Sequence, residues 1–522
     1  MSFNNSGLGN FSSSKWKSVA VIFVALFLVY YSYVLWTNLC DVAGGADSSG
    51  YLNFAWRLRH GNLREPVKAL DALGLGEEFS PPFRPIGFSW GVNSRIMVPA
   101  YPVGLPLHMV FFAEFLGWDI GPYLVSPIAA LIGLFLMYCL ARQFGLSRSF
   151  SLAGAALLAA FPVYLFMAVQ PMSDLLACVW GMAAVLAGLL SRKRSGWAVL
   201  AGAAFGLGFL VRSANILLLL ALVLALPFKP KIYLKFILGG VCFGIFHSIL
   251  NHALYGSMFT TGYRGELLGQ LGTKDLLPRF IFYGRWFVKM LTPLVPLAWL
   301  LALLDRKVVF KDRLLLIVWF LPSLVFYCLY QPFNSWTLVR YFLPALPALI
   351  LSTLLVLRDG MDYFRHKIHA SRGTSQMPRP LSKKFLTALP KVVAGLLFVL
   401  VISTEMSQVK RLKLLDVNEF ESVYKLSCLL VKKTLPEKSI VLSGQMSGAL
   451  AYYTDFLPCL WDQLQPQPFS LICEKASQRG YSIYALLFPS EENEFQKNAP
   501  GAWEKIENFQ FVSLWRLATG AR

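Results

Sequence analysis

Long apolar runs recur along this chain and restrict what it can fold into. A helix that crosses a membrane needs about 20 mostly apolar residues. Hydrophobic residues make up 56% of the 522 residues and charged residues only 15%, against about 25% charged in soluble domains. The sequence therefore predicts a polytopic α-helical membrane protein with soluble parts. Eleven candidate spans lie near residues 19–39, 120–141, 150–169, 174–190, 197–211, 213–227, 232–254, 280–304, 314–330, 339–357 and 386–404.

The basic residues predict an orientation in the membrane. If residues 100–117 lie on the membrane without crossing it, six segments on the side of the N-terminus hold 21 Lys and Arg residues. The short loops on the opposite side hold far fewer. Because basic loops remain in the cytoplasm, we expect a cytoplasmic N-terminus and an exterior C-terminus. The net charge of +20 then reflects topology, and nucleic acid is not an expected partner.

Two segments are predicted to lie outside the membrane. Residues 1–404 form the expected transmembrane domain, within which residues 40–119 are an exterior loop, called here the first loop. Residues 405–522 are far less apolar and are expected to form a small exterior α/β domain, periplasmic in a bacterium. Alternation of strands and helices favours a small, largely parallel sheet. Strands are predicted at 439–443, 481–488 and 511–517, and helices at 448–453 and 469–479.

The first loop carries the densest chemical signal. Asp47 precedes a short aromatic-rich segment that ends at Gly61, and Asn53, Arg57 and His60 share one helical face of it. Such a helix can lie in the membrane interface. Asp47 has two interpretations, a carboxylate that caps the helix N-terminus and a catalytic base or metal ligand that meets a lipid-borne substrate.

Five stretches, in this order, resemble motifs of the superfamily of lipid-dependent glycosyltransferases with the C-type fold. Protein O-mannosyltransferases and the lipid A aminoarabinose transferase belong to it. Where members usually have a Glu after the first Asp, this chain has Ser48, and no acidic residue stands clearly at the entrance to the second interfacial helix. A metal requirement is therefore left open. The stretches are Asp47 to Gly61, Tyr101 to Pro106, Pro171 to Asp174, Tyr255 to Tyr263 and Arg340 to Pro344.

The resemblance implies inverting transfer of one sugar from a polyprenyl phosphate to an acceptor hydroxyl at the outer face of a bacterial inner membrane. The acceptor would be a glycan, a lipid or a protein. Asp47 is the expected base, with Asp174 as a second metal ligand if a divalent metal is bound. The expected substrate-binding residues are Asp174, Arg212, Arg340, Tyr341, Tyr101 and Arg264. Asp174 could also be an ordinary helix start, and Arg212 and Arg340 could be arginines that snorkel to the surface.

Two other functions fit the hydrophobic pattern. A secondary transporter would also have many spans, although such proteins tend to show paired repeats and broken helices around a midplane site. A polyprenyl-linked glycan ligase or polymerase would share the lipid but would move a long glycan. The eight cysteines show no CxxC pair and no regular spacing, so they indicate neither a disulfide scaffold nor a zinc site.

Overall fold

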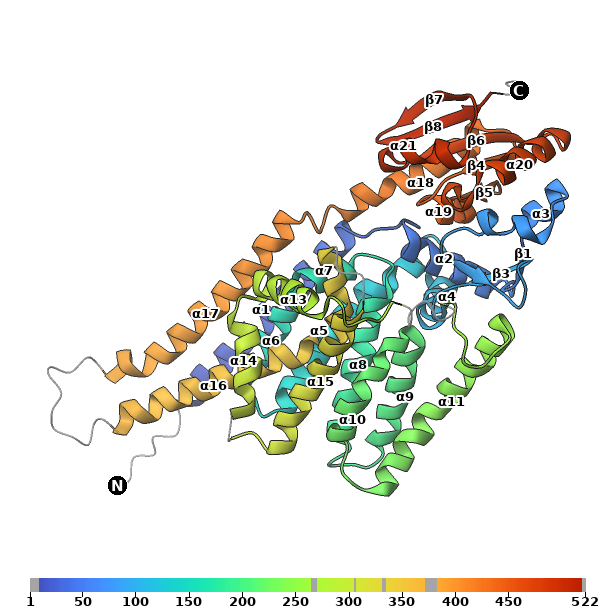
Figure 1. Cartoon of the computed structure of the whole chain (residues 1–522). Helices are drawn as coiled ribbons and strands as arrows, with labels where there is room; N and C mark the ends of the chain where they lie inside the picture. Colours follow the sequence, from blue (N-terminus) through green and yellow to red (C-terminus); the bar gives the residue numbers. More distant parts are fainter. Residues whose placement is uncertain (1–8, 264–269, 305–306, 331–334, 371–382, 519–522) are drawn as a thin grey trace, which may run out of the picture.

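A long helical bundle carries a smaller α/β unit at one end (Figure 1). The structure is a computed structural model that describes residues 9–263, 270–304, 307–330, 335–370 and 383–518. The bundle contains α1 (Gly9–Thr37), α5 (Gly121–Gln143), α6 (Arg148–Ala160), α7 (Pro162–Ala168), α8 (Ser173–Leu190), α9 (Trp197–Val211), η3 (Ser213–Leu218), α10 (Leu219–Ala225), α11 (Pro230–Tyr255), α13 (Leu276–Leu291), α14 (Leu294–Leu301), η4 (Ala302–Leu304), α15 (Phe310–Leu329), η5 (Trp336–Ala345), α16 (Leu346–Ala370) and α17 (Lys383–Arg411).

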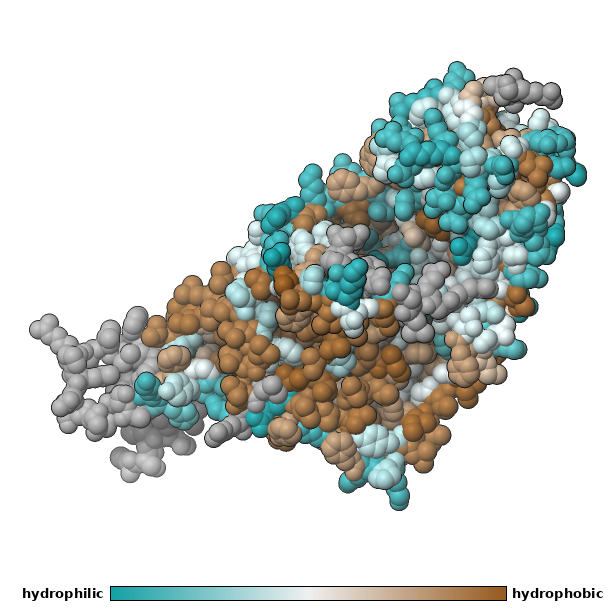
Figure 2. Space-filling model, viewed as in Figure 1, coloured by the Kyte–Doolittle hydropathy of each residue, from teal (hydrophilic) through white to brown (hydrophobic). Residues whose placement is uncertain are grey.

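The bundle has the surface of an integral membrane protein. Within the described ranges, six helices are long and apolar enough to cross a membrane, and the bent pair α6–α7 makes a seventh. Shorter apolar helices, among them α9, coincide with further expected spans. Helix α8 and the span formed by η5 and α16 are the most enclosed, whereas α11 and α17 leave most of their apolar residues at the surface. Figure 2 shows a broad hydrophobic zone on the bundle. The count of eleven spans stays a prediction.

Two of the expected spans are each divided between two helices. The run 150–169 bends by 67° between α6 and α7. Pro162 begins the second helix there, and it has no N–H to continue the first. The run 280–304 divides into α13 and α14 at Thr292, which has a φ of 63° and precedes Pro293. A left-handed residue followed by proline ends the hydrogen-bond ladder of a helix.

The first loop folds against the end of the bundle that faces the α/β unit (Figure 1). It contains α2 (Ala46–Arg59), β1 (Glu65–Pro66), α3 (Lys68–Leu73), η1 (Glu77–Phe79), η2 (Pro81–Phe83), β2 (Phe88–Trp90), β3 (Ile96–Pro99) and α4 (Gly104–Leu116). The three strands form an antiparallel sheet in the order β1-β3-β2. At 13 residues, α4 is about 20 Å long, shorter than a hydrocarbon core of about 30 Å. This length supports an interfacial position for α4.

The C-terminal unit is a five-stranded sheet with helices, in the order β5-β4-β6-β8-β7. Strands β5, β4 and β6 are parallel, but β8 is antiparallel to both β6 and β7. The prediction of a largely parallel sheet was therefore wrong, because a two-residue turn joins β7 to β8 and forces an antiparallel hairpin. Its elements are α18 (Val417–Thr434), β4 (Ser439–Leu442), α19 (Ser447–Tyr453), β5 (Leu457–Cys459), η6 (Trp461–Gln463), α20 (Pro466–Gln478), β6 (Ser482–Leu487), α21 (Pro489–Asn498), β7 (Trp503–Phe509) and β8 (Val512–Leu517).

Candidate functional site

Helix α2 begins one turn earlier than the sequence indicates and holds Asp47 in its first turn. The N-cap is Gly45, with a φ of 49°, and no side chain caps the helix. The interpretation of Asp47 as a capping carboxylate was therefore wrong. The carboxylate of Asp47 is 31% exposed, and it accepts hydrogen bonds from residues outside its own helix.

Asp47 is bound on both carboxylate oxygens. Its Oδ1 accepts a hydrogen bond from the Tyr101 hydroxyl at 2.8 Å, and its Oδ2 accepts one from Arg340 Nη2 at 2.6 Å. The ring of Tyr101 reaches this position because it lies directly against Gly50, where an added Cβ would overlap the ring. Gly87, with a φ of 88°, packs on the same glycine. The glycines therefore let three segments of the first loop meet beside Asp47.

A second carboxylate continues the array. Asp174, in the first turn of α8, accepts a hydrogen bond from Arg212, the residue that follows α9. The other oxygen of Asp174 lies 4.0 Å from Arg340 Nε. The four side chains thus alternate in charge in the order Asp47, Arg340, Asp174, Arg212. Side-chain exposure is 31% at Asp47, 2% at Asp174 and 19% at Arg212, so Asp174 is the most deeply buried member of the row.

Tyrosine rings line this row of charges. The guanidinium carbons of Arg212 and Arg340 lie 4.7 and 5.4 Å from the centre of the Tyr341 ring. Both are within the range in which a cation is attracted to an aromatic face. Tyr341 also stacks on Tyr327, with ring centres 5.0 Å apart. One aromatic ring therefore orients both arginines, which reduces the freedom that each would lose on binding an anion.

Known proteins share this architecture. ArnT from Cupriavidus metallidurans, in its complex with undecaprenyl phosphate, superposes with a TM-score of 0.58 and 14% identity, over 96% of this chain and 100% of that one. The oligosaccharyltransferase AglB from Archaeoglobus fulgidus, in complex with an inhibitory peptide and a dolichol phosphate, gives 0.51 and 12%, over 89% and 69%. Both have the C-type fold of the superfamily whose motifs the sequence resembles. This chain has the C-type glycosyltransferase fold.

Further comparisons agree with the C-type fold. Arabinofuranosyltransferase AftD from Mycobacteria superposes with a TM-score of 0.54 and 12% identity, over 95% of this chain and 42% of that one. The sequence profile of the dolichyl-phosphate-mannose-protein mannosyltransferase family matches residues 107–250, which include α8, α9 and most of α11. No curated protein matches the sequence. The resemblance inferred from the five motifs is confirmed at the level of the fold.

The C-type fold brings together six of the seven residues singled out in the sequence. They are Asp47, Tyr101, Asp174, Arg212, Arg340 and Tyr341. Arg264 lies outside the described residues. Sequence reasoning missed Tyr51, whose hydroxyl donates to Ser173 Oγ at 2.8 Å, and Tyr263, which packs edge-on against Tyr101. Tyr51 stands one helical turn after Asp47, a spacing that could have identified it.

The surroundings of Asp47 keep its carboxylate charged. Burial by itself would raise the pKa of Asp47. The charge of Arg340 and the hydrogen bonds from Tyr101 and Arg340 outweigh that effect, so the pKa lies below its ordinary value of 3.8. Asp47 is thus a carboxylate, ready to accept a proton, at neutral pH.

The donor set of this site does not fit a divalent metal. In the described part of the chain, no group of three or more His, Cys, Asp or Glu side chains could hold an ion. The guanidinium of Arg340 lies between Asp47 and Asp174, and it occupies the position where a cation would bridge the two carboxylates. Hard divalent cations need several oxygen ligands. We therefore assign no chemical step to a metal.

The C-terminal unit holds the segment that leads into α2. Lys425 Nζ lies 2.6 Å from Asp41 Oδ2, and the Tyr453 hydroxyl accepts a hydrogen bond from Ala43 N at 2.8 Å. Glu421 packs so closely on Gly44 that an added Cβ would overlap its carboxylate. These contacts lie three to six residues before Asp47, so the α/β unit positions the first loop of the C-type fold.

We expect the contact at Glu421 to depend on pH. Burial raises the pKa of the Glu421 carboxyl from 4.5 to about 7, and Cys40 and Tyr424 are the titratable groups close enough to feel its charge. A raised pKa means that the folded contact favours the protonated acid. The contribution of this contact to stability is complete below pH 4.5, and it is lost as the pH rises through about 7.

Amide hydrogen exchange at residues 40–46, normalised to the intrinsic rate at each pH, measures this effect. Protection in this segment should be higher at pH 5.5 than at pH 8. In Glu421→Gln the difference between the two pH values should disappear. Equal protection of the wild-type segment at both values would contradict the prediction.

Proposed function

We propose that this protein is an inverting glycosyltransferase. It moves a single sugar from a polyprenyl phosphate to an acceptor hydroxyl at the outer face of a bacterial inner membrane, with the N-terminus cytoplasmic and the C-terminal unit periplasmic. The observation that carries the proposal is the alternating row of Asp47, Arg340, Asp174 and Arg212 at the end of a C-type bundle. The lipid phosphates present in the ArnT and AglB complexes support the choice of donor.

Asp47 is the proposed general base. The acceptor oxygen attacks the anomeric carbon while the bond from that carbon to the phosphate oxygen breaks. The acceptor proton passes to the Asp47 carboxylate, and the electron pair of the broken bond leaves with the polyprenyl phosphate. Because this is a single displacement, the configuration at the anomeric carbon inverts. A positioned base typically contributes about 10²- to 10⁴-fold to such a step.

The two arginines are the proposed binding site for the phosphate. The leaving lipid phosphate gains one negative charge as the glycosidic bond breaks, and fixed positive groups at that position stabilise the transition state. Arg212 and Arg340 flank the buried Asp174 and pack on Tyr341. Asp174 therefore acts as a positioning residue that holds both guanidiniums in place. Tyr101 does the same for the Asp47 carboxylate.

Mass spectrometry of cell-envelope glycans tests the proposed function. A strain that lacks this protein should contain glycans that are shorter by one sugar, and the wild-type gene should restore that sugar. Loss of an entire glycan chain would instead indicate a ligase or polymerase. Unchanged glycans, together with solute uptake by proteoliposomes that contain the purified protein, would indicate a transporter. Either outcome would contradict single-sugar transfer.

A further inference from the structure

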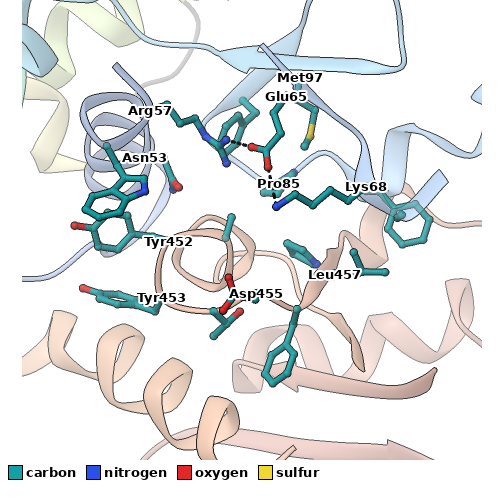
Figure 3. A pocket seen from close by; sticks show the side chains of 18 of the residues that line it. Asn53, Arg57, Glu65, Lys68, Pro85, Met97, Tyr452, Tyr453, Asp455 and Leu457 are labelled. Carbon is teal, nitrogen blue, oxygen red and sulfur yellow. Dashed lines mark ion pairs between the residues drawn. The ribbon is translucent and has the colours of Figure 1, made fainter. Parts of the chain in front are cut away.

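A cavity lies beside α2, between the first loop and the C-terminal unit (Figure 3). Its volume is about 370 Å³, within the range of small-molecule sites. One wall is formed by α2, β1 and the start of α3, and the other by the segment 451–458 of α19 and β5. Lys432 of α18 contributes to the second wall. The cavity is therefore assembled only when the two parts of the chain are in contact.

Aromatic side chains give the cavity flat apolar surfaces. Trp56, Tyr452 and Tyr453 line it, and Trp56 is 43% exposed. The position of Tyr452 is fixed by a 2.8 Å hydrogen bond from Trp118 Nε1, and Trp118 packs edge-on against Trp56. The hydroxyl of Tyr453 is engaged with the backbone of Ala43. The tyrosine hydroxyls are thus used within the protein, and the rings remain as packing surfaces.

Polar groups of both kinds stand beside these rings. Glu65 pairs with Arg57 and, at 3.0 Å, with Lys68, and the three side chains point toward one another at the cavity wall (Figure 3). Asn53 is 3% exposed, and its Nδ2 donates to Ser49 O and Gly448 O. The polar atom that Asn53 can offer a ligand is therefore its Oδ1. Donors and acceptors thus alternate along one wall, with no strong excess of one charge.

We propose that this cavity binds the carbohydrate part of the acceptor, an assignment that rests on the proposed function. Sugar rings have apolar C–H faces that pack on aromatic side chains. Their adjacent hydroxyls need neighbouring donors and acceptors such as Arg57, Glu65 and Lys68. A small site that combines several aromatic side chains with a few placed polar groups meets both needs.

The position of the cavity fits an acceptor that reaches the base. Asp47 and Asn53 lie on the same helix, six residues apart, and Arg57 lies ten residues from Asp47. At 1.5 Å per residue, the cavity therefore begins about 9 Å from Asp47 along the axis of α2 and continues to about 15 Å. For a terminal hydroxyl to reach Asp47, an oligosaccharide seated in the cavity must span at least this distance along α2. A single sugar would be too short.

A peptide acceptor fits this cavity less well. Peptides commonly bind by adding a strand to an exposed sheet edge, and β5 is an edge strand of the five-stranded sheet. The η2 turn packs against β5, and Leu460 N, immediately after β5, donates to Pro82 O at 2.6 Å. The ladder of backbone hydrogen bonds that would recognise a peptide is thus unavailable at this wall.

Kinetics with the full-length protein in proteoliposomes test the assignment. The donor is the polyprenyl-phosphate sugar, and the acceptor is supplied as the envelope extract, glycolipids and proteins together, of a strain that lacks the protein. We expect Trp56→Ala and Lys68→Glu each to raise the KM for the acceptor at least tenfold and to leave the KM for the donor near the wild-type value. Lys68 is 68% exposed, so its variant should fold even if Trp56→Ala does not.

Two matched variants serve as controls. Trp197→Ala removes a tryptophan that is 38% exposed at the start of α9, and Lys497→Glu reverses an exposed charge on α21. Neither residue lines the cavity, and both variants should keep the wild-type KM. Periodate, which cleaves vicinal diols, should destroy the acceptor, and proteinase K should not.

Three outcomes would overturn the assignment. An unchanged acceptor KM in a folded Lys68→Glu variant would overturn it while leaving the proposed function intact. An acceptor that is sensitive to proteinase K would also overturn it and would indicate a protein acceptor. Absence of any transfer by the wild-type protein would reject the proposed function itself, and the assignment would fall with it.

Discussion

Replacement of Asp47 by Asn is expected to lower the rate of sugar transfer by about 10²- to 10⁴-fold, the usual contribution of a general base. The amide has nearly the same shape and can still accept the 2.8 Å hydrogen bond from Tyr101, so the protein should stay folded. The amide, however, cannot take the proton from the acceptor hydroxyl. Initial rates with purified protein, polyprenyl-phosphate sugar and acceptor glycolipid measure the effect.

Asp71→Asn is the matched control for this variant. Asp71 lies on α3 in the same loop and forms an exposed ion pair with Arg95, away from the row of charges. Its replacement should leave the transfer rate within about twofold. Because the pKa of Asp47 lies below 3.8, Asp47 becomes protonated only at more acidic pH. The wild-type transfer rate should therefore fall only in that acidic range. A folded Asp47→Asn variant with full activity would remove Asp47 from the mechanism.

The sequence predicts the helical bundle well because lipid imposes a simple rule. A spanning helix must be apolar over its length, so its position can be recognised without tertiary information. The breaks at Pro162 and Pro293 were not predicted, because proline alone does not determine a break. Pro127 and Pro322 lie inside the continuous helices α5 and α15. Whether a helix continues through proline depends on how its neighbours satisfy the freed carbonyl.

The C-terminal unit shows another limit of sequence patterns. Strand β7 was missed because its central residues are exposed and mostly polar, as expected for an edge strand that has no face in the core. Without β7, the hairpin with β8 is not visible in the sequence, and the remaining strands suggest a parallel sheet. Strands β4 and β6 were found because they are buried apolar runs.

The candidate site was predictable only in part. Asp47 and Arg340 are 293 residues apart, and their proximity follows from a resemblance of motifs, because no local pattern links them. The contacts that Gly44 and Asn53 make with Glu421 and Gly448 have no sequence signal at all. They depend on how two folded surfaces fit together, and that fit is a property of packing between distant segments.

Asp174→Asn is expected to destabilise the protein and also to change how it binds a lipid phosphate. The carboxylate of Asp174 is 2% exposed and lies between Arg212 and Arg340. Removing one partner of a buried ion pair costs about 3–5 kcal/mol because the other charge stays uncompensated. We expect the lower end of that range, since Arg212 is 19% exposed and Arg340 keeps Asp47. Unfolding titrations with SDS measure this loss.

The double variant Asp174→Asn/Arg212→Gln separates charge from packing. It removes both members of the pair, so it should recover part of the free energy of unfolding that the single variant loses, as a double-mutant cycle requires of coupled residues. Binding of polyprenyl phosphate provides an independent reading. In Asp174→Asn, one carboxylate no longer competes with the phosphate for the two guanidiniums. The lipid phosphate should therefore bind more tightly than in the wild type. In the double variant this gain should be lost. Additive losses of stability, with unchanged affinity for the lipid, would mean that Asp174 is not coupled to the two arginines where a phosphate binds.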